Sequence, residues 1–317
     1  MSPRTRHSQS GAALLLAMII VTLVSTIAAG MVWQQSRAIH VEAAERARAQ
    51  VGWMLHSGID FAREVVRRFD DANPQRDQPW DADLAETRLS ALLAADRDNS
   101  ADASLDAFIS GRISDAQSRY NLHRLVGVDG KLVEVEAKAF TRLCEAIGLP
   151  DSAAMVMSGL VKAHAAQAAD RAADAAIAPT RVEQLIWLGV DPASLARLME
   201  FVELLPVDTP VNLNTARREV IYAAIDGISL SDAERLVRVR ATRFASIEQL
   251  VSERLLAPTI ALDPGRVSVK TSYFVAEATV RFEDNAITER ALLERQGAGA
   301  SATVVVRRSE RFPLRAT

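Results

Sequence analysis

The chain begins with a long apolar segment that contains no charged side chain. After a short polar stretch, residues 12–33 form a run of 22 residues that only small or mildly polar side chains interrupt. A helix rises about 1.5 Å per residue, so this run would extend about 33 Å, enough to cross the hydrocarbon core of a bilayer. The pattern therefore predicts one membrane-spanning helix.

The residues that flank this segment predict its orientation. Arg4, Arg6 and His7 precede it, and no acidic residue does. Because positively charged flanks stay on the cytoplasmic side, we expect the first eleven residues in the cytoplasm and the bulk of the chain on the periplasmic side of the inner membrane. A signal peptidase would need small residues after a shorter apolar region, and the small residues at 26–30 lie inside the run, so such cleavage ranks second. A permanent, unprocessed signal anchor is a further alternative.

The helical pattern continues beyond the apolar run. From Gln34 to Phe69, apolar side chains recur at spacings of three and four residues, which is typical of an amphipathic helix. We therefore expect one long helix that leaves the membrane and enters a soluble domain. The recurring positions are Ile39, Ala43, Ala47, Val51, Leu55, Ile59, Ala62, Val66 and Phe69.

The next segments predict a boundary followed by a helical region. Residues 70–106 are polar and acidic, and their prolines stop the first helix, so we interpret them as a boundary with loops. Residues 108–127 predict a strand that leads into a turn at Asn121. Residues 134–205 predict consecutive helices with short connections, because glycine and proline residues separate the helical stretches.

The last part of the chain predicts a helical pair and then strands. Within residues 205–250 we expect one helix capped by Asn214 or Thr215 and a second helix that begins at Ser231. After Pro264 the apolar positions alternate, which favours antiparallel strands. The expected strands cover 267–282, 287–296 and 303–306. Helices and strands in separate blocks indicate an α+β fold.

Composition and charge exclude several classes of function. The chain has 37 basic and 40 acidic residues, so its net charge of −3 offers no basic surplus for nucleic acid. Its single cysteine, Cys144, cannot form an intramolecular disulfide, and we expect it on a buried helical face. The five histidines are scattered, and no nucleophile elbow, phosphate loop or paired carboxylate appears, so we expect no enzyme.

The N-terminal residues resemble a known family. A basic leader, Gly11, an apolar helix and an amphipathic continuation are similar to the N-terminus of type IV pilins and pseudopilins. This resemblance implies that prepilin peptidase cuts after Gly11 and that Ala12 becomes the mature, N-methylated first residue. Most members carry glutamate at the fifth mature position, where this chain has Leu16. Lack of that acid is typical of the K-type minor pseudopilins of type II secretion, the general secretion pathway protein K family.

A second motif matches the same family. Asp115, followed by Arg119, Tyr120, Asn121 and Leu122, fits the pattern with which K-type chains enter an inserted helical domain, although His123 and Arg124 replace small polar residues. The resemblance implies a pilin-like fold in which the long helix packs on an antiparallel sheet and a SAM-like, helix-hairpin-helix-like domain interrupts that sheet. The implied divisions are a leader at 1–11, a membrane helix at 12–33, a stalk and first pilin part at 34–118, the insert at 119–263 and the final strands at 264–317.

The resemblance also implies partners and a role. The chain would join the I-type and J-type minor pseudopilins in a complex at the pseudopilus tip, contact the major pseudopilin, and begin or cap the assembly that exports folded proteins from the periplasm. The alternative from another class is a membrane-anchored helix-hairpin-helix protein for DNA uptake. That function needs a glycine-rich turn that binds phosphate, but here the turn is Asp226-Gly227-Ile228-Ser229, so we expect no nucleic-acid partner.

Calcium is the one metal that the resemblance suggests, since K-type pseudopilins often hold it in an acidic loop of the insert. The matching region has only Asp151, Asp170 and Asp174, spread along a helical pattern without a glycine-containing loop. Residues 96–106 resemble a calcium loop only faintly, through Asp96, Asp98 and Asp102, and we interpret them as a solvated linker. The sequence therefore predicts no cofactor.

Overall fold

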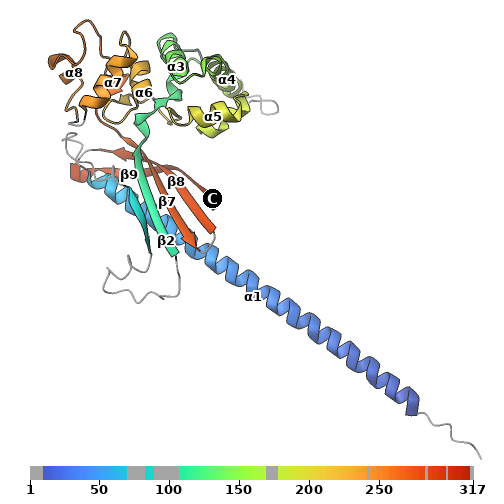
Figure 1. Ribbon diagram of the computed structural model, residues 1–317. Coiled ribbons are helices and arrows are strands. Elements are labelled where there is room, and N and C mark those ends of the chain that lie inside the picture. Colours follow the sequence, from blue (N-terminus) through green and yellow to red (C-terminus); the bar gives the residue numbers. More distant parts are fainter. Residues whose placement is uncertain are drawn as a thin grey trace, which may run out of the picture. The chain divides into compact units, whose positions relative to one another are not determined.

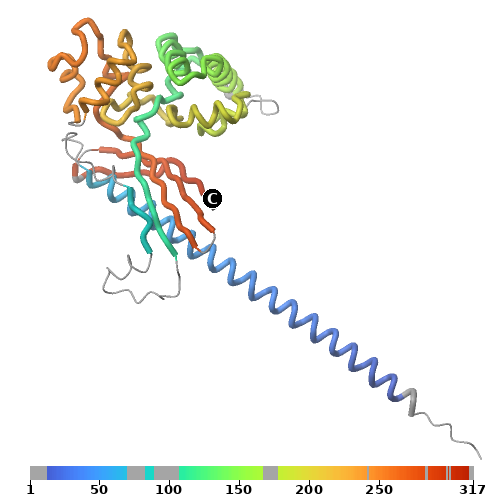
Figure 2. Tube along the Cα trace, viewed as in Figure 1, coloured from blue at the N-terminus to red at the C-terminus, as the bar shows by residue number. Residues whose placement is uncertain are grey.

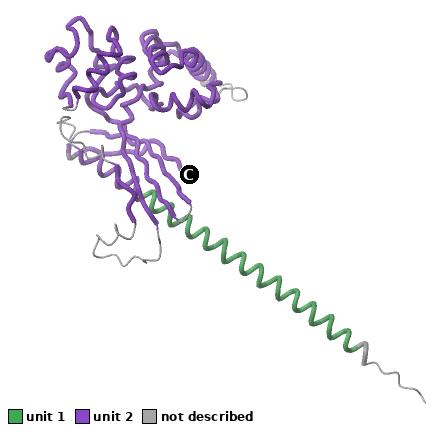
Figure 3. Tube along the Cα trace, viewed as in Figure 1, with its two compact units in different colours: residues 1–56 green, residues 57–317 purple. Residues whose placement is uncertain are grey.

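The computed structural model describes residues 10–69, 83–88, 107–168, 178–240, 243–282, 285–297 and 299–314. The chain divides into two compact units, residues 1–56 and residues 57–317 (Figure 3). The first unit contains most of helix α1, and the second contains the end of that helix, a sheet and a helical insert (Figure 1).

Helix α1, Ser10–Arg68, is continuous over 59 residues and confirms the predicted passage from the apolar run into an amphipathic helix. It contains no proline, and its apolar half consists largely of alanine, leucine and other helix-compatible residues. Arg67 and Arg68 occupy its last turn, where positive charge complements the helix dipole. Both arginines also contact Glu64 one turn earlier, which supports the end of the helix.

The second unit contains a five-stranded antiparallel sheet with the order β1-β2-β7-β8-β9. Strands β2 and β7 are neighbours along their full length, with Ala107 opposite Phe282 and Asp115 opposite Phe274. The Cα trace leaves the sheet at the end of β2 and returns at the start of β7 (Figure 2). The strands are β1 Leu84–Arg88, β2 Ala107–Asp115, β7 Tyr273–Phe282, β8 Asn285–Gln296 and β9 Thr303–Leu314.

The last three turns of α1 pack on this sheet. A Cβ atom at Gly58 would lie 2.8 Å from the Cβ atom of Ala278, so the helix and β7 approach closely there. Farther along, the ring of Phe69 meets the ring of Phe274 edge-on, with centroids 5.5 Å apart. Since Ala278 follows Phe274 in β7, α1 runs antiparallel to β7, toward the end of the sheet at which the insert begins.

The insert folds around one apolar core. This core extends from Tyr120 through Phe140 and Leu198 to Phe244 and Val269, all of them buried. Two short parallel pairs, β3 with β4 and β5 with β6, join segments that are distant in sequence. The elements are η1 Ala116–Ser118, β3 Tyr120–Asn121, η2 Leu122–Leu125, α3 Glu134–Ala146, α4 Pro150–Ala168, η3 Val182–Leu188, α5 Pro192–Leu198, β4 Val202–Glu203, β5 Val211–Asn212, α6 Arg218–Ala224, α7 Leu230–Val239, α8 Gln249–Ser252 and β6 Val267–Ser268; η4 Gly299–Ser301 lies between β8 and β9.

The structure corrects two predictions about the sheet. Strand β1 lies inside the segment that we interpreted as a boundary. Backbone pairing with β2 holds it in place. Its side chains are mostly exposed, so its sequence lacks the alternating pattern of a half-buried strand. Strand β9 extends to Leu314 rather than Val306. Its charged second half pairs with β8, where the guanidinium of Arg311 lies 2.6 Å from the carboxylate of Glu289.

Three predictions about the insert were also wrong in detail. Helix α5 ends at Leu198, and the following residues form β4 because they pair with β3. Helix α6 begins at Arg218, because the side chains of Asn214 and Thr215 bond elsewhere in the fold instead of capping it. Val267 and Val269 belong to the core of the insert, not to the sheet. The predicted insert boundaries at 119 and 263 stay a prediction.

Candidate functional site

The surface of the first unit is apolar where the sequence predicts a membrane. Within the described part of the chain, one helix is long and apolar enough to cross a bilayer; its most apolar window has a mean hydropathy of 2.5, and none of it is buried. Leu16 lies on this surface with an exposed fraction of 61%. Gly11 and Ala12 lie in the first turn of α1. The two predicted processing positions and the fifth mature position therefore lie within the first two turns of α1.

The predicted Asp115 motif forms the polar joint through which the chain enters the insert. The Asp115 carboxylate is buried and accepts hydrogen bonds from the Gln117 backbone amide and from the side chains of Thr271, Asn212 and Thr215, over 2.5–2.8 Å. Burial raises the pKa of this carboxyl, although the hydrogen bonds act in the opposite direction. The joint ties the end of β2 to one segment inside the insert and to another at its end.

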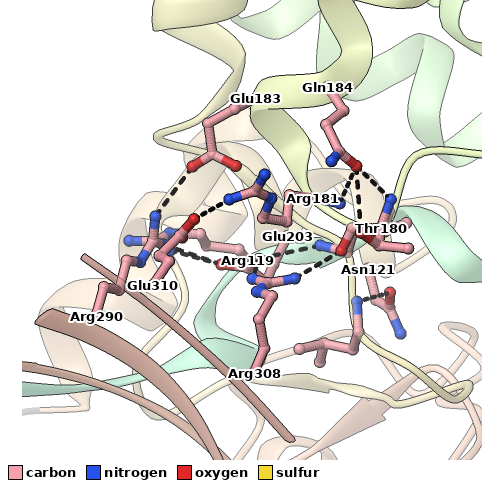
Figure 4. A network of polar contacts seen from close by, with 12 residues as sticks. Arg119, Asn121, Thr180, Arg181, Glu183, Gln184, Glu203, Arg290, Arg308 and Glu310 are labelled. Atoms are coloured by element: carbon pink, nitrogen blue, oxygen red, sulfur yellow. Dashed lines mark hydrogen bonds and ion pairs between the residues drawn. The ribbon is translucent and has the colours of Figure 1, made fainter. Parts of the chain in front are cut away.

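A second polar cluster lies between the insert and the outer strands of the sheet (Figure 4). Glu203, on β4, is only 2% exposed, and its carboxylate lies within reach of three guanidinium groups. The nitrogen atoms of Arg119, Arg290 and Arg308 are 3.0, 3.4 and 3.5 Å from its oxygens. We call these four residues the arginine junction. Since a buried carboxylate is costly without partners, Glu203 fixes where the sheet arginines can lie.

Further contacts extend the arginine junction on the insert side. Arg290 also bonds Glu183 of η3 at 3.2 Å, and Arg308 donates to the backbone carbonyl of Thr180 at 2.6 Å (Figure 4). Arg181 forms an ion pair with Glu310 of β9. Strands β8 and β9 therefore hold the insert by charged hydrogen bonds, which are stronger and more directional than apolar contacts.

A third buried acid stabilises the insert itself. Glu136 of α3 accepts hydrogen bonds from Tyr120 at 2.7 Å, Arg124 at 2.9 Å and Arg266 at 3.0 Å. Burial works to raise the pKa of Glu136, but the hydrogen bond and charge of Arg124, with Tyr120 and Arg266, outweigh it and lower the pKa. Tyr120 and Arg124 belong to the entry motif, so the motif anchors α3 as well as the joint.

Comparison with known proteins finds similarity to a known family. The family model described as type II secretion system, protein K, matches residues 211–270. The type II secretion system protein K of Pseudomonas aeruginosa is 28% identical over 74% of this chain and 73% of its own length. That of Pectobacterium carotovorum is 27% identical over 92% of this chain and 94% of its own.

The fold gives the same result over most of the chain. A chain in the crystal structure of the GspK-GspI-GspJ complex from enterotoxigenic Escherichia coli matches with a TM-score of 0.64. It is 17% identical, and the match covers 85% of this chain and 98% of that one. In sequence and in fold, this chain is similar to the type II secretion system protein K family. The predicted α+β pilin-like fold, with its long helix and antiparallel sheet, is confirmed.

The region that the family model matches includes the helical hairpin that resembles a DNA-binding module. Asp226, in its turn, forms an ion pair with Arg142 at 2.6 Å. The N-terminus of α7 is closed by Ser229 and Asp232, whose carboxylate accepts from the Ser229 backbone amide at 3.0 Å. Carboxylates thus occupy the positions at which such a hairpin would receive a phosphate.

The structure places Cys144 and one of the candidate calcium ligands, Asp151. Cys144 is a free and fully buried thiol, and burial raises its pKa to about 12. The predicted position of Cys144 on a buried helical face is therefore confirmed. Within the described ranges, no group of three histidine, cysteine or carboxylate side chains could hold a metal ion. Asp151 is an exposed first-turn residue of α4. The other calcium candidates, Asp96, Asp98, Asp102, Asp170 and Asp174, lie outside the described residues.

Sequence reasoning missed the arginine junction and Glu136. Glu203 did carry a signal, because it is the one charged residue in the apolar stretch Phe201–Leu205. A lone acid in such a stretch is either exposed or paired after folding, and the sequence names no partner. Arg290, Arg308 and Glu136 carry no signal, since each lies among other charged residues.

We expect Glu203→Gln to lower the free energy of unfolding of the second unit by about 2–4 kcal/mol, because three partly buried guanidinium groups lose their shared, buried negative charge. Urea unfolding of the full chain in detergent would measure the loss. The matched control is Glu200→Gln, whose ion pair with Arg217 is 55% exposed on both sides and should contribute less than about 1 kcal/mol. Equal losses in the two variants would contradict a structural role for the junction.

The pH dependence of stability should separate the two buried acids. Glu136 has a lowered pKa, so its contribution is complete above its ordinary value of 4.5 and is lost as pH falls through the folded-state pKa. Asp115 has a raised pKa, so its contribution is complete below 3.8 and is lost as pH rises through the folded-state pKa. Between about pH 3 and 6, Glu136→Gln should therefore flatten the acid side of the stability profile and Asp115→Asn should steepen it. If both variants changed the slope of the stability profile in the same direction, one of the two assigned pKa directions would be wrong.

Proposed function

We propose that this minor pseudopilin begins pseudopilus assembly and remains at its tip, where the insert prevents the addition of another subunit. The observation that carries the proposal is the direction of α1 in the second unit. From Gly58 to Phe69 the helix runs toward the sheet end at which Asp115 and Tyr273 connect to the insert. A subunit stacked beyond that end would meet the insert instead of an open sheet.

The N-terminal helix supports the same position. A neighbouring pilin-type subunit offers an N-terminal ammonium that a glutamate at the fifth mature position can bind, but this chain has Leu16. A carboxylate in hydrocarbon is costly unless it is paired. Leucine at this position is therefore suited to a subunit that has no preceding neighbour in the filament.

The proposal includes partners and location. The solved relative is titled as a complex of GspK with GspI and GspJ, which supports I-type and J-type minor pseudopilins as partners in a tip complex. The major pseudopilin would follow below them, and prepilin peptidase would process the chain. We place the N-terminus in the cytoplasm and the second unit in the periplasm, with α1 crossing the inner membrane. The role is structural rather than catalytic and requires no cofactor.

Processing can be tested on the protein purified from membranes. We expect an intact mass that corresponds to a chain beginning with N-methylated Ala12, and only in cells that contain prepilin peptidase. Gly11→Val should keep Met1 even with the peptidase present, because the cut requires the small residue. Retention of Met1 by the parent chain would show instead that α1 is an ordinary signal anchor.

Tip capping can be tested by removing the insert. In this variant a short glycine-serine linker replaces residues 116–272, and Arg290 and Arg308 become serine because they would lose Glu203. If the insert blocks addition, immunogold label on the variant should appear along pseudopili, whereas label on the parent stays at their ends. Circular dichroism would first establish that the variant folds. Label at the ends in both proteins would contradict the capping role.

A further inference from the structure

A groove separates the insert from the outer strands of the sheet within the second unit. It has a volume of about 590 Å³ and is open to solvent on one side. One wall comes from η2 and α4 of the insert, and the opposite wall comes from β8 and β9. Its apolar lining includes Leu122, Val126, Leu160, Leu204, Leu205 and Leu292. A groove of this size and character holds several apolar side chains of a ligand.

The charged groups of the groove all have one sign. Its lining includes Arg307, Arg308, His123 and His164 but no aspartate or glutamate. Burial lowers the pKa of His123, and Arg308 is paired with Glu203 in the arginine junction, so Arg307 supplies the positive charge at the rim. Arg307 forms an ion pair with Glu294 outside the lining and remains 42% exposed. A guanidinium has five N–H donors, so this arginine can still bind a carboxylate that enters the groove.

Two residues of β9, Arg307 and Arg308, line the groove. In the sheet order β9 is the last strand, so no other strand of the described chain lies beyond it. Arg63 of α1 donates to the Val304 carbonyl at 3.1 Å and covers the beginning of the edge. Val305 and Val306 are each 36% exposed, and a bulge at Arg307 follows them. Edge strands of this kind accept an added strand through their backbone groups.

We propose that this groove and the adjoining edge of β9 bind an extended peptide segment of a partner protein that carries apolar side chains next to carboxylates. Apolar side chains would bind beside Val126 and Leu204, the half-buried valine and leucine of the lining, while carboxylates would bind Arg307 at the rim. The segment would run beside β9 as an additional strand. This binding site does not depend on where the subunit lies in the pseudopilus.

The test uses the full chain in detergent and three fluorescent peptides of equal length. The first alternates valine or leucine with aspartate or glutamate, the second replaces the acids with lysine, and the third replaces the apolar residues with serine. Fluorescence anisotropy should show saturable binding of the first peptide and at least about tenfold weaker binding of the other two. Equal binding of the acidic and basic peptides, or no binding of the first at 1 mM, would overturn the proposal.

Two matched pairs of variants locate the site. Arg307→Gln should weaken the binding of the acidic peptide about tenfold. The matched control is Arg281→Gln, which should leave the binding unchanged. Arg281 is likewise exposed, at 43%, and paired with a glutamate, but lies outside the groove lining. Val128, at the groove rim, is fully exposed, so its replacement should leave the fold intact. Val128→Asp should weaken the binding of the acidic peptide, because it adds a negative charge at the rim, and Val128→Lys should not weaken it. Binding that none of these variants changes would place the peptide elsewhere and overturn the assignment.

Discussion

The carboxylate of Asp115 lies where two neighbouring strands separate to admit residues 116–272. Strands β2 and β7 pair along their full length, so the insert must leave and return at the same end of the sheet. Asp115 closes this opening by accepting hydrogen bonds from Thr271 beside the returning strand and from Asn212 and Thr215 inside the insert. Because a buried carboxylate must find such donors, the joint determines the path of the chain on both sides of the opening.

The arginine junction adds an orientation to that connection. Asp115 holds the insert near β2 and β7, whereas Glu203 and its partners hold it against β8 and β9. Two separated attachments restrain rotation in a way that a single connection cannot. Charged contacts suit this purpose, since each guanidinium accepts only a few geometries, while an apolar interface tolerates sliding. Between the insert and the sheet, Leu205 also packs in a small apolar cluster with Tyr273 and Leu292.

The two units contribute different parts of the function. The first presents apolar side chains that require lipid or neighbouring helices, which suits assembly from the membrane. The second carries its own core and its ion pairs, which suit a folded domain in the periplasm. In the proposed tip position, Leu16 would remove a charge that needs a neighbour, and the insert would fill the place of the next subunit.

The sequence alone determined the features that depend on local pattern. The apolar run and its heptad-like continuation predicted α1 as one helix, since both length and periodicity are local properties. The order of the leader, Leu16 and the Asp115 motif indicated the family, and alternation predicted β7, although not that it begins only at Tyr273. Strand β1 was missed because only its backbone pairing with β2 makes it a strand, and the second half of β9 because cross-strand ion pairs balance its charges.

Tertiary structure decided the partners of the buried charges. Glu203 was visible in the sequence as a lone acid, but Arg119, Arg290 and Arg308 come from segments 84 to 105 residues away, and nothing local selects them from the other arginines. The caps predicted at Asn214 and Thr215 failed for the same reason, because stronger long-range donors and acceptors compete for these side chains. Periodicity therefore determines where helices and strands form, whereas the cost of burying a charge or a polar group is decided by neighbours that only the folded chain brings together.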